Sequence, residues 1–169
     1  VKYVGHDDND LVMLRYAEVL LNYAEAKERL GGLNQSDLDK TINLLRDRVG
    51  MVHMKLDNLP AGSDVRTEIQ RERRIELFFE GHRYFDIIRW KQGHLLGEDL
   101  LGVNKRWLDQ SRLAVDLNKD LTWKTKDGQQ YLLIETGRTF NPDKHYLLPI
   151  PFKQMQLNPN LAPQNPGWK

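Results

Sequence analysis

Apolar residues recur at helical spacing through the first half of the chain. The longest such pattern covers residues 11–30 and ends at Gly31-Gly32, and it carries two adjoining apolar stripes: Leu14, Ala17, Leu21 and Ala24, and Met13, Tyr16, Leu20 and Tyr23. A helix that is apolar around most of its circumference is typically buried among other helices. We therefore expect residues 11–30 to form a helix inside a layered helical array, with Asp10 as its N-cap.

Three more helices are predicted before residue 93. They cover residues 37–49, capped by Ser36 and ended by Gly50, residues 64–80, capped by Ser63, and residues 82–92, ended by Gly93. The short link between the first two predicted helices indicates an antiparallel pair. Two helical hairpins in succession predict a mainly α fold with a tetratricopeptide-like helical-hairpin scaffold.

The pattern changes after residue 93. Two apolar–polar segments, residues 121–126 and 129–134, flank Asp127-Gly128. An Asp-Gly pair favours the positive φ angles of a tight turn, so these segments predict a small β-hairpin. Three prolines close to the C-terminal end predict irregular loops there. We expect a single domain over residues 1–169, with a helical-repeat core over 1–93 and variable loops, the hairpin and a closing segment over 94–169.

Composition excludes several classes of function. The 25 basic and 24 acidic side chains give a net charge of +1, so no basic stripe predicts nucleic-acid binding. Without cysteine there is no disulfide, thiolate metal site or cysteine nucleophile. The five histidines lack the spacing of a helical zinc site, and residues 7–10 (Asp-Asp-Asn-Asp) lack the spacing and glycine of a calcium loop. We therefore expect neither a metal nor a cofactor.

Charged residues are densest over residues 71–90. Glu76, Glu80 and Asp86 could supply the two carboxylates that glycoside hydrolysis requires. However, arginines stand three positions from these carboxylates, a spacing that stabilises a helix, and arginine lowers a carboxyl pKa, whereas a general acid needs it raised. We therefore expect no catalytic residue and predict a structural ion-pair network of Arg73, Glu76, Arg83, Asp86 and Arg89.

Tryptophan offers the best sequence signal for ligand binding, because an indole ring can stack on the apolar face of a sugar. Trp90 has the spacing of a core residue, and Trp168 is placed to pin down the C-terminal segment. Trp107 and Trp123 lie in the loop and hairpin segments and are weak candidates for ligand contacts. Burial of both rings in the core is the alternative.

Four blocks of sequence, in order, resemble the C-terminal region of SusD/RagB proteins. They are residues 14–26 (Leu-Arg-Tyr-Ala-Glu-Val-Leu-Leu-Asn-Tyr-Ala-Glu-Ala), residues 41–50, residues 72–90 (beginning Glu-Arg-Arg-Ile-Glu-Leu-Phe-Phe-Glu-Gly-His-Arg-Tyr-Phe-Asp), and residues 146–161 with 164–168. The resemblance covers nearly the whole chain and departs most freely over residues 93–139.

The resemblance implies a function that composition does not. SusD/RagB proteins are lipid-anchored on the outer face of the outer membrane of Bacteroidetes, and the anchor would lie outside this chain. They have no catalytic activity and help a SusC-like TonB-dependent transporter to capture oligosaccharides or, in some members, peptides. The matching blocks are scaffold blocks, so the resemblance assigns no ligand-contacting residue here. The alternative is a generic helical-repeat scaffold that binds proteins and has no glycan-binding role.

Overall fold

The computed structural model describes residues 14–168, which fall into two compact units that divide between Arg83 and Tyr84. The predicted mainly helical fold class is confirmed, with a small three-stranded sheet in the second unit. The sequence pattern predicted that the helical part of the chain ends at residue 93, ten residues after the division between the two units. The prediction of a single domain over 1–169 stays a prediction. The N-cap predicted at Asp10 lies outside the described residues.

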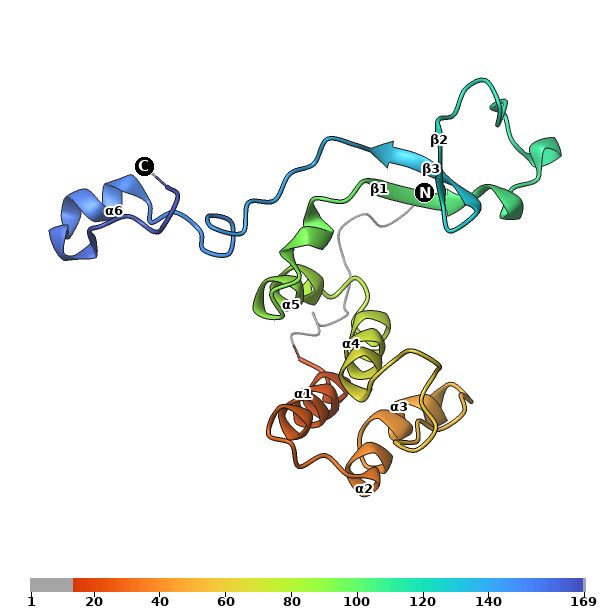
Figure 1. The fold of residues 1–169 in the computed structure, drawn as a ribbon, viewed down its shortest axis with the longest axis horizontal. Coiled ribbons are helices and arrows are strands. Elements are labelled where there is room, and N and C mark those ends of the chain that lie inside the picture. Colours follow the sequence, from red (N-terminus) through yellow and green to blue (C-terminus); the bar gives the residue numbers. More distant parts are fainter. Residues whose placement is uncertain (1–13, 169) are drawn as a thin grey trace, which may run out of the picture. The chain divides into compact units, whose positions relative to one another are not determined.

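The first unit contains α1 (Tyr16–Arg29), α2 (Gln35–Asp39), α3 (Ile42–Arg48) and α4 (Val65–Glu76), with α1 packed against α3 and α4 (Figure 1). The two stripes predicted on residues 11–30 are buried only in part. Leu14, Tyr16 and Tyr23 are exposed, so α1 buries one face, formed by Ala17, Leu20, Leu21 and Ala24, and not most of its circumference. The core of this unit is Ala17, Leu20, Leu21, Ala24, Leu38, Ile42, Leu45, Met54, Ile69 and Leu77.

The single helix predicted over 37–49 is two helices, with a break at Lys40-Thr41. The Thr41 hydroxyl donates to the Asp37 carbonyl over 2.6 Å, and a side chain that satisfies a backbone group competes with the regular helix. The cap also differs from the predicted Ser36. The Asn34 side chain accepts from the Asp37 amide at 3.0 Å, and the Asp37 carboxylate accepts from the Asn34 amide at 3.2 Å, which is a reciprocal capping box.

Helix α4 starts one residue later than predicted and ends earlier than residue 80. Asp64, and not Ser63, caps it by accepting from the Thr67 amide at 2.7 Å. After Glu76 the backbone leaves the helix, since Phe79 has a φ of 66° and Gly81 a φ of 78°, both in the left-handed region. The next helix, α5 (His82–Arg89), follows at once.

In the second unit, β2 (Trp123–Lys126) and β3 (Gln129–Glu135) form the predicted hairpin. Asp127 and Gly128 have φ angles of 50° and 72°, as a two-residue turn of this kind requires. A strand that the sequence pattern did not predict, β1 (Leu100–Asn104), pairs antiparallel with β3, so the strand order is β1-β3-β2 (Figure 1).

The second unit also contains several short helical turns. They are the 3₁₀ turns η1 (Gly93–Leu96), η2 (Lys105–Trp107), η3 (Gln110–Arg112) and η4 (Pro159–Leu161), and the helix α6 (Phe152–Leu157), where irregular loops were predicted. Trp168 pins the closing segment as its position predicted, because its indole N–H donates to the Leu147 carbonyl at 2.9 Å. Phe140 packs directly on Gly93, where a Cβ would lie 2.1 Å from the Phe140 Cζ.

Candidate functional site

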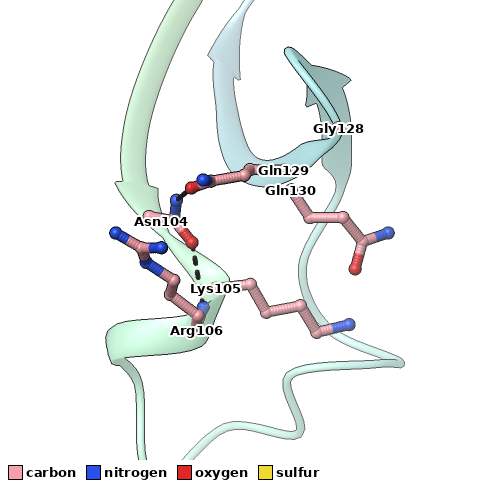
Figure 2. A pocket seen from close by; sticks show the side chains of 6 residues that line it. All are labelled: Asn104, Lys105, Arg106, Gly128, Gln129 and Gln130. Carbon is pink, nitrogen blue, oxygen red and sulfur yellow. Dashed lines mark hydrogen bonds between the residues drawn. The ribbon is translucent and has the colours of Figure 1, made fainter.

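An open pocket of about 350 Å³ lies where β1 runs into η2 beside the turn of the hairpin (Figure 2). Its lining combines amide and cationic side chains with one glycine: Asn104, Lys105, Arg106, Gly128, Gln129 and Gln130. The hairpin turn brings residues 128–130 to this point, and the pairing of β1 with β3 brings residues 104–106 opposite them.

Asn104 holds the two sides of the pocket together. Its side chain is buried, at 3% relative exposure, and its Oδ1 accepts from the Arg106 amide at 3.0 Å, which caps η2. Its Nδ2 donates to the Gln129 Oε1, as Figure 2 shows. Both ends of this buried amide are therefore hydrogen-bonded within the fold, and together they fix η2 against the hairpin.

The two tryptophans predicted as weak ligand contacts each lie beside a cation of the pocket. The Lys105 Nζ is 5.0 Å from the centroid of the Trp123 ring, and the Arg106 guanidinium carbon is 5.3 Å from that of Trp107. Trp107 is 71% exposed. Trp123 is half-buried, and its indole N–H donates to the Leu117 carbonyl at 2.5 Å, which fixes the orientation of the ring.

This arrangement suits a ligand rich in hydroxyl groups. The amides of Gln129 and Gln130 can both donate and accept, and exposed indole surface can stack on a sugar ring. None of the six lining residues is a carboxylate or a histidine, the side chains that most often act as general acid or base.

The carboxylates of residues 71–90 are occupied by arginines, some of them from distant parts of the first unit. Glu76 accepts from the Arg15 Nη1 at 2.5 Å and lies 2.7 Å from the Arg48 Nη2. Glu80 lies 2.7 Å from the Arg15 Nη2. The hydrogen bond from Arg15 lowers the pKa of Glu80, and the same bond raises the pKa of Arg15. A general acid needs the opposite shift, because it must hold its proton near neutral pH.

The other members of the predicted network take several kinds of partner. Asp86 is buried and forms the predicted pair with Arg89 at 2.8 Å in the second unit. Arg73 is also buried, and its Nη1 donates to the Asn22 Oδ1 over 2.7 Å. Arg83 is half-buried at the end of the first unit. Helical spacing could not indicate Arg15 or Arg48 as partners of Glu76. Arg15 is the residue before α1 and Arg48 is the last residue of α3, so both come from other parts of the chain.

Two further pockets flank residues 51–60 in the first unit, with volumes of about 450 Å³ and 530 Å³, and His53 lines both. Two of their ionisable side chains already have partners, since Arg46 pairs with Glu72 and the His53 Nε2 lies 2.5 Å from Asp47. No tryptophan, tyrosine or phenylalanine lines either of them. They are therefore weaker candidates for ligand binding than the pocket beside the hairpin.

Two properties hold for residues 14–168. No three histidine or acidic side chains come together in a group that could hold a metal ion. No helix in this range has the length and apolar character needed to cross a bilayer. The acidic residues 7–10 lie outside this range.

Sequence reasoning missed most of the pocket. It singled out Trp107 and Trp123 but not Asn104, Lys105, Arg106, Gln129 or Gln130. The Asp-Gly turn predicted where residues 128–130 would fold. No local pattern indicated that residues 100–104 form a strand against the same hairpin, so the opposite wall could not be assigned.

Comparisons of the sequence and of the fold with known proteins all find SusD-like proteins. The SusD family model matches residues 2–168. A SusD-like protein of Formosa agariphila, named P2, is 32% identical over 93% of this chain and 26% of its own length. A crystal structure of a SusD-like carbohydrate-binding protein from Bacteroides fragilis is 31% identical, with a TM-score of 0.66 over 88% of this chain and 28% of its own.

A second SusD-like protein of Bacteroides fragilis is 29% identical, with a TM-score of 0.64 over 98% of this chain and 28% of its own. The chain thus spans about a quarter of the length of the relatives that it matches.

Proposed function

This chain belongs to the SusD family, and on that premise we propose that it contributes to a non-catalytic, cell-surface nutrient-binding protein whose ligand is a glycan. The observation that carries the proposal is the amide-lined pocket at the hairpin, with Trp107 and Trp123 each beside one of its cations. Aromatic rings and hydrogen-bonding amides are the groups that recognise the apolar faces and the hydroxyls of sugars.

The comparisons support the ligand class in general terms. One solved relative, 31% identical to this chain, is described as a carbohydrate-binding protein. In this chain, Trp107 has most of its surface available for contact, and the orientation of Trp123 is fixed by a hydrogen bond. A ring that is already held in place loses little conformational entropy when it contacts a ligand.

The partner and the location follow from the family as proposals. We infer a complex with a SusC-like TonB-dependent transporter at the surface of the outer membrane, where a lipid anchor would hold the protein. Affinity purification of the tagged full-length protein from its native membranes tests the inference. Recovery of a TonB-dependent transporter supports it, and its absence from solubilised membranes that contain the transporter argues against it.

The lack of catalysis is likewise a proposal. It is supported by the arginines around Glu76 and Glu80 and by the pKa of Glu80, which is lowered. Incubating the full-length protein with each glycan that it binds should release no reducing ends. Release that is abolished in Glu76→Gln would overturn the proposal.

One observation favours the alternative function, a helical-repeat scaffold that binds proteins. Phe78 and Phe79 are 68% and 93% exposed in the first unit, and their ring centroids are 4.2 Å apart. Exposed neighbouring aromatic rings are a common feature of protein interfaces. A scaffold without a glycan role should bind a protein partner through these rings and bind no saccharide.

Binding by the full-length protein to a panel of polysaccharides decides between the two functions. Affinity electrophoresis identifies a ligand, and calorimetry then measures Kd for the wild type, Trp107→Ala and Trp123→Ala. We expect each variant to weaken binding about tenfold, the effect of truncating an important aromatic contact. Phe152→Ala removes another exposed aromatic side chain, from α6, and serves as the control. The glycan proposal fails if no polysaccharide binds or if both tryptophan variants bind like this control.

A further inference from the structure

The charges around the hairpin are unevenly matched. Four acidic side chains near the sheet and its loops pair with four bases: Asp99 with Lys124, Glu98 with Lys126, Asp109 with Arg112, and Asp116 with Lys119. Within residues 14–168, no carboxylate lies within ion-pair distance of either Lys105 or Arg106. The two cations that line the pocket are therefore not neutralised by an ion pair within residues 14–168.

The contacts that these cations do make are with neutral groups. The Lys105 Nζ donates to the Asn118 Oδ1 at 2.8 Å and lies over Trp123, and the Arg106 guanidinium lies near the ring of Trp107. An amide and an aromatic ring orient a cation, but neither cancels its charge, and an exposed cation–π contact is weak, about 0.5–1 kcal/mol. Both positive charges thus stay available to a ligand.

We propose that the glycan bound at this pocket is acidic, with carboxylate or sulfate groups along its chain. This inference rests on the proposed glycan-binding function and specifies its ligand. Figure 2 shows the side chains of Lys105 and Arg106 extending to different sides of Asn104, so the two charges do not converge on one point. They suit an extended polymer that carries repeated acidic groups better than a single small anion.

The neutral part of the pocket fits the same ligand. The amides of Gln129 and Gln130 lie along the wall formed by the hairpin and can bond the hydroxyls between two acidic groups. The charge of the whole unit agrees, since residues 84–169 contain twelve basic and nine acidic side chains. A net positive surface raises the local concentration of an anionic ligand and speeds its association.

Matched pairs of polymers test the proposal with the full-length protein. The carboxylate pair is polygalacturonate and its carboxyl-reduced form, and the sulfate pair is dextran sulfate and dextran. We expect the acidic member of at least one pair to bind about tenfold or more tightly than its neutral form at low ionic strength, and salt to reduce the difference. The pair that shows the difference identifies the acidic group.

Charge-matched variants locate the effect. Lys105→Gln and Arg106→Gln should each weaken binding of the acidic polymer about threefold to tenfold, and should weaken binding of the neutral form less. Lys119→Gln and Arg112→Gln remove the same charge from bases that are paired with Asp116 and Asp109, and should have little effect.

Other outcomes of these binding measurements would overturn either the acidic ligand or glycan binding as a whole. If neutral and acidic forms bind equally, or all four variants behave alike, the acidic ligand is wrong while glycan binding stands. If single-stranded DNA binds as tightly as the acidic polymer, the site recognises polyanions in general and the inference is overturned. If no saccharide of the wider panel binds, the proposed function itself fails, and this inference with it.

Discussion

Replacing Asn43 with leucine is expected to destabilise the first unit and to release residues 51–58 from its core. Asn43 is fully buried on α3. Its Nδ2 donates to the Met54 carbonyl at 3.1 Å and to the Asp39 Oδ1 at 2.7 Å, and its Oδ1 accepts from the Met54 amide at 2.7 Å. One side chain thus satisfies both backbone groups of Met54, which is itself a core residue.

The magnitude follows from the one backbone group that loses its only partner. Leucine has as many side-chain heavy atoms as asparagine, so the change leaves little cavity. The Met54 N–H is left unsatisfied in a buried site, whereas the Met54 C=O keeps a hydrogen bond from the Gln35 Nε2 at 3.0 Å. A buried polar group left unsatisfied costs about 1–3 kcal/mol. Burial of the added apolar carbons returns a part of this, so we expect a net loss of about 1–2 kcal/mol.

Hydrogen exchange of the full-length protein measures this loss locally. The amide of Met54 should exchange about 5-fold to 30-fold faster in Asn43→Leu, because each 1.36 kcal/mol of opening free energy changes the rate about tenfold. Asn58→Leu makes the same substitution at an exposed position of the same loop and is the control. Equal exchange rates at Met54 in both variants would refute the reasoning.

Three further predictions concern stability, each read from urea or thermal unfolding of the full-length protein. In Gly93→Ala the added Cβ would overlap the Phe140 ring, so the free energy of unfolding should fall by about 1–3 kcal/mol. Gly32→Ala adds a Cβ in open space and should leave stability unchanged. Equal unfolding midpoints for the two variants would contradict the packing of Phe140 on Gly93. Asn34→Ala removes one half of the capping box and should cost about 0.5–2 kcal/mol, and retention of wild-type stability would mean that the box contributes nothing. Because the hydrogen bond with Arg15 lowers the pKa of Glu80, its stabilisation should be complete above the ordinary glutamate pKa of 4.5 and decline as the pH falls through the lower folded value. The difference in unfolding midpoint between the wild type and Glu80→Gln should therefore shrink on acidification, and a constant difference would argue against the pair.

Features that depend on a few neighbouring residues were predictable from the sequence. Asp127-Gly128 specified the hairpin because few other residue pairs adopt two positive φ angles at low cost. The periodic apolar positions of residues 11–30 and 64–80 indicated helices, which the structure has over 16–29 and 65–76, because amphipathic spacing of this kind is visible within one segment. The four sequence blocks also indicated the SusD family, which the family match confirms.

The candidate site was predictable only in part. Trp107 and Trp123 were singled out because they lie in the loop and hairpin segments. Neither ring lines the pocket, but each lies against a cation that does. Strand β1 escaped prediction because its sequence, Leu-Leu-Gly-Val-Asn, lacks regular alternation and it pairs with β3 through an irregular register.

The sequence by itself therefore determined the long helices α1 and α4, the hairpin and the family, since these follow from local backbone preferences and from motifs read along the chain. Only the tertiary structure decided that Arg15 and Arg48 neutralise Glu76 and that Asn104 joins η2 to the hairpin. It also decided that Lys105 and Arg106 line a pocket without acidic partners among residues 14–168. The physical reason is distance along the chain. The contacts of Arg15 and Arg48 with Glu76 and of Asn104 with Gln129 join residues 25 or more positions apart, and no local preference records which distant side chains folding brings within hydrogen-bonding reach.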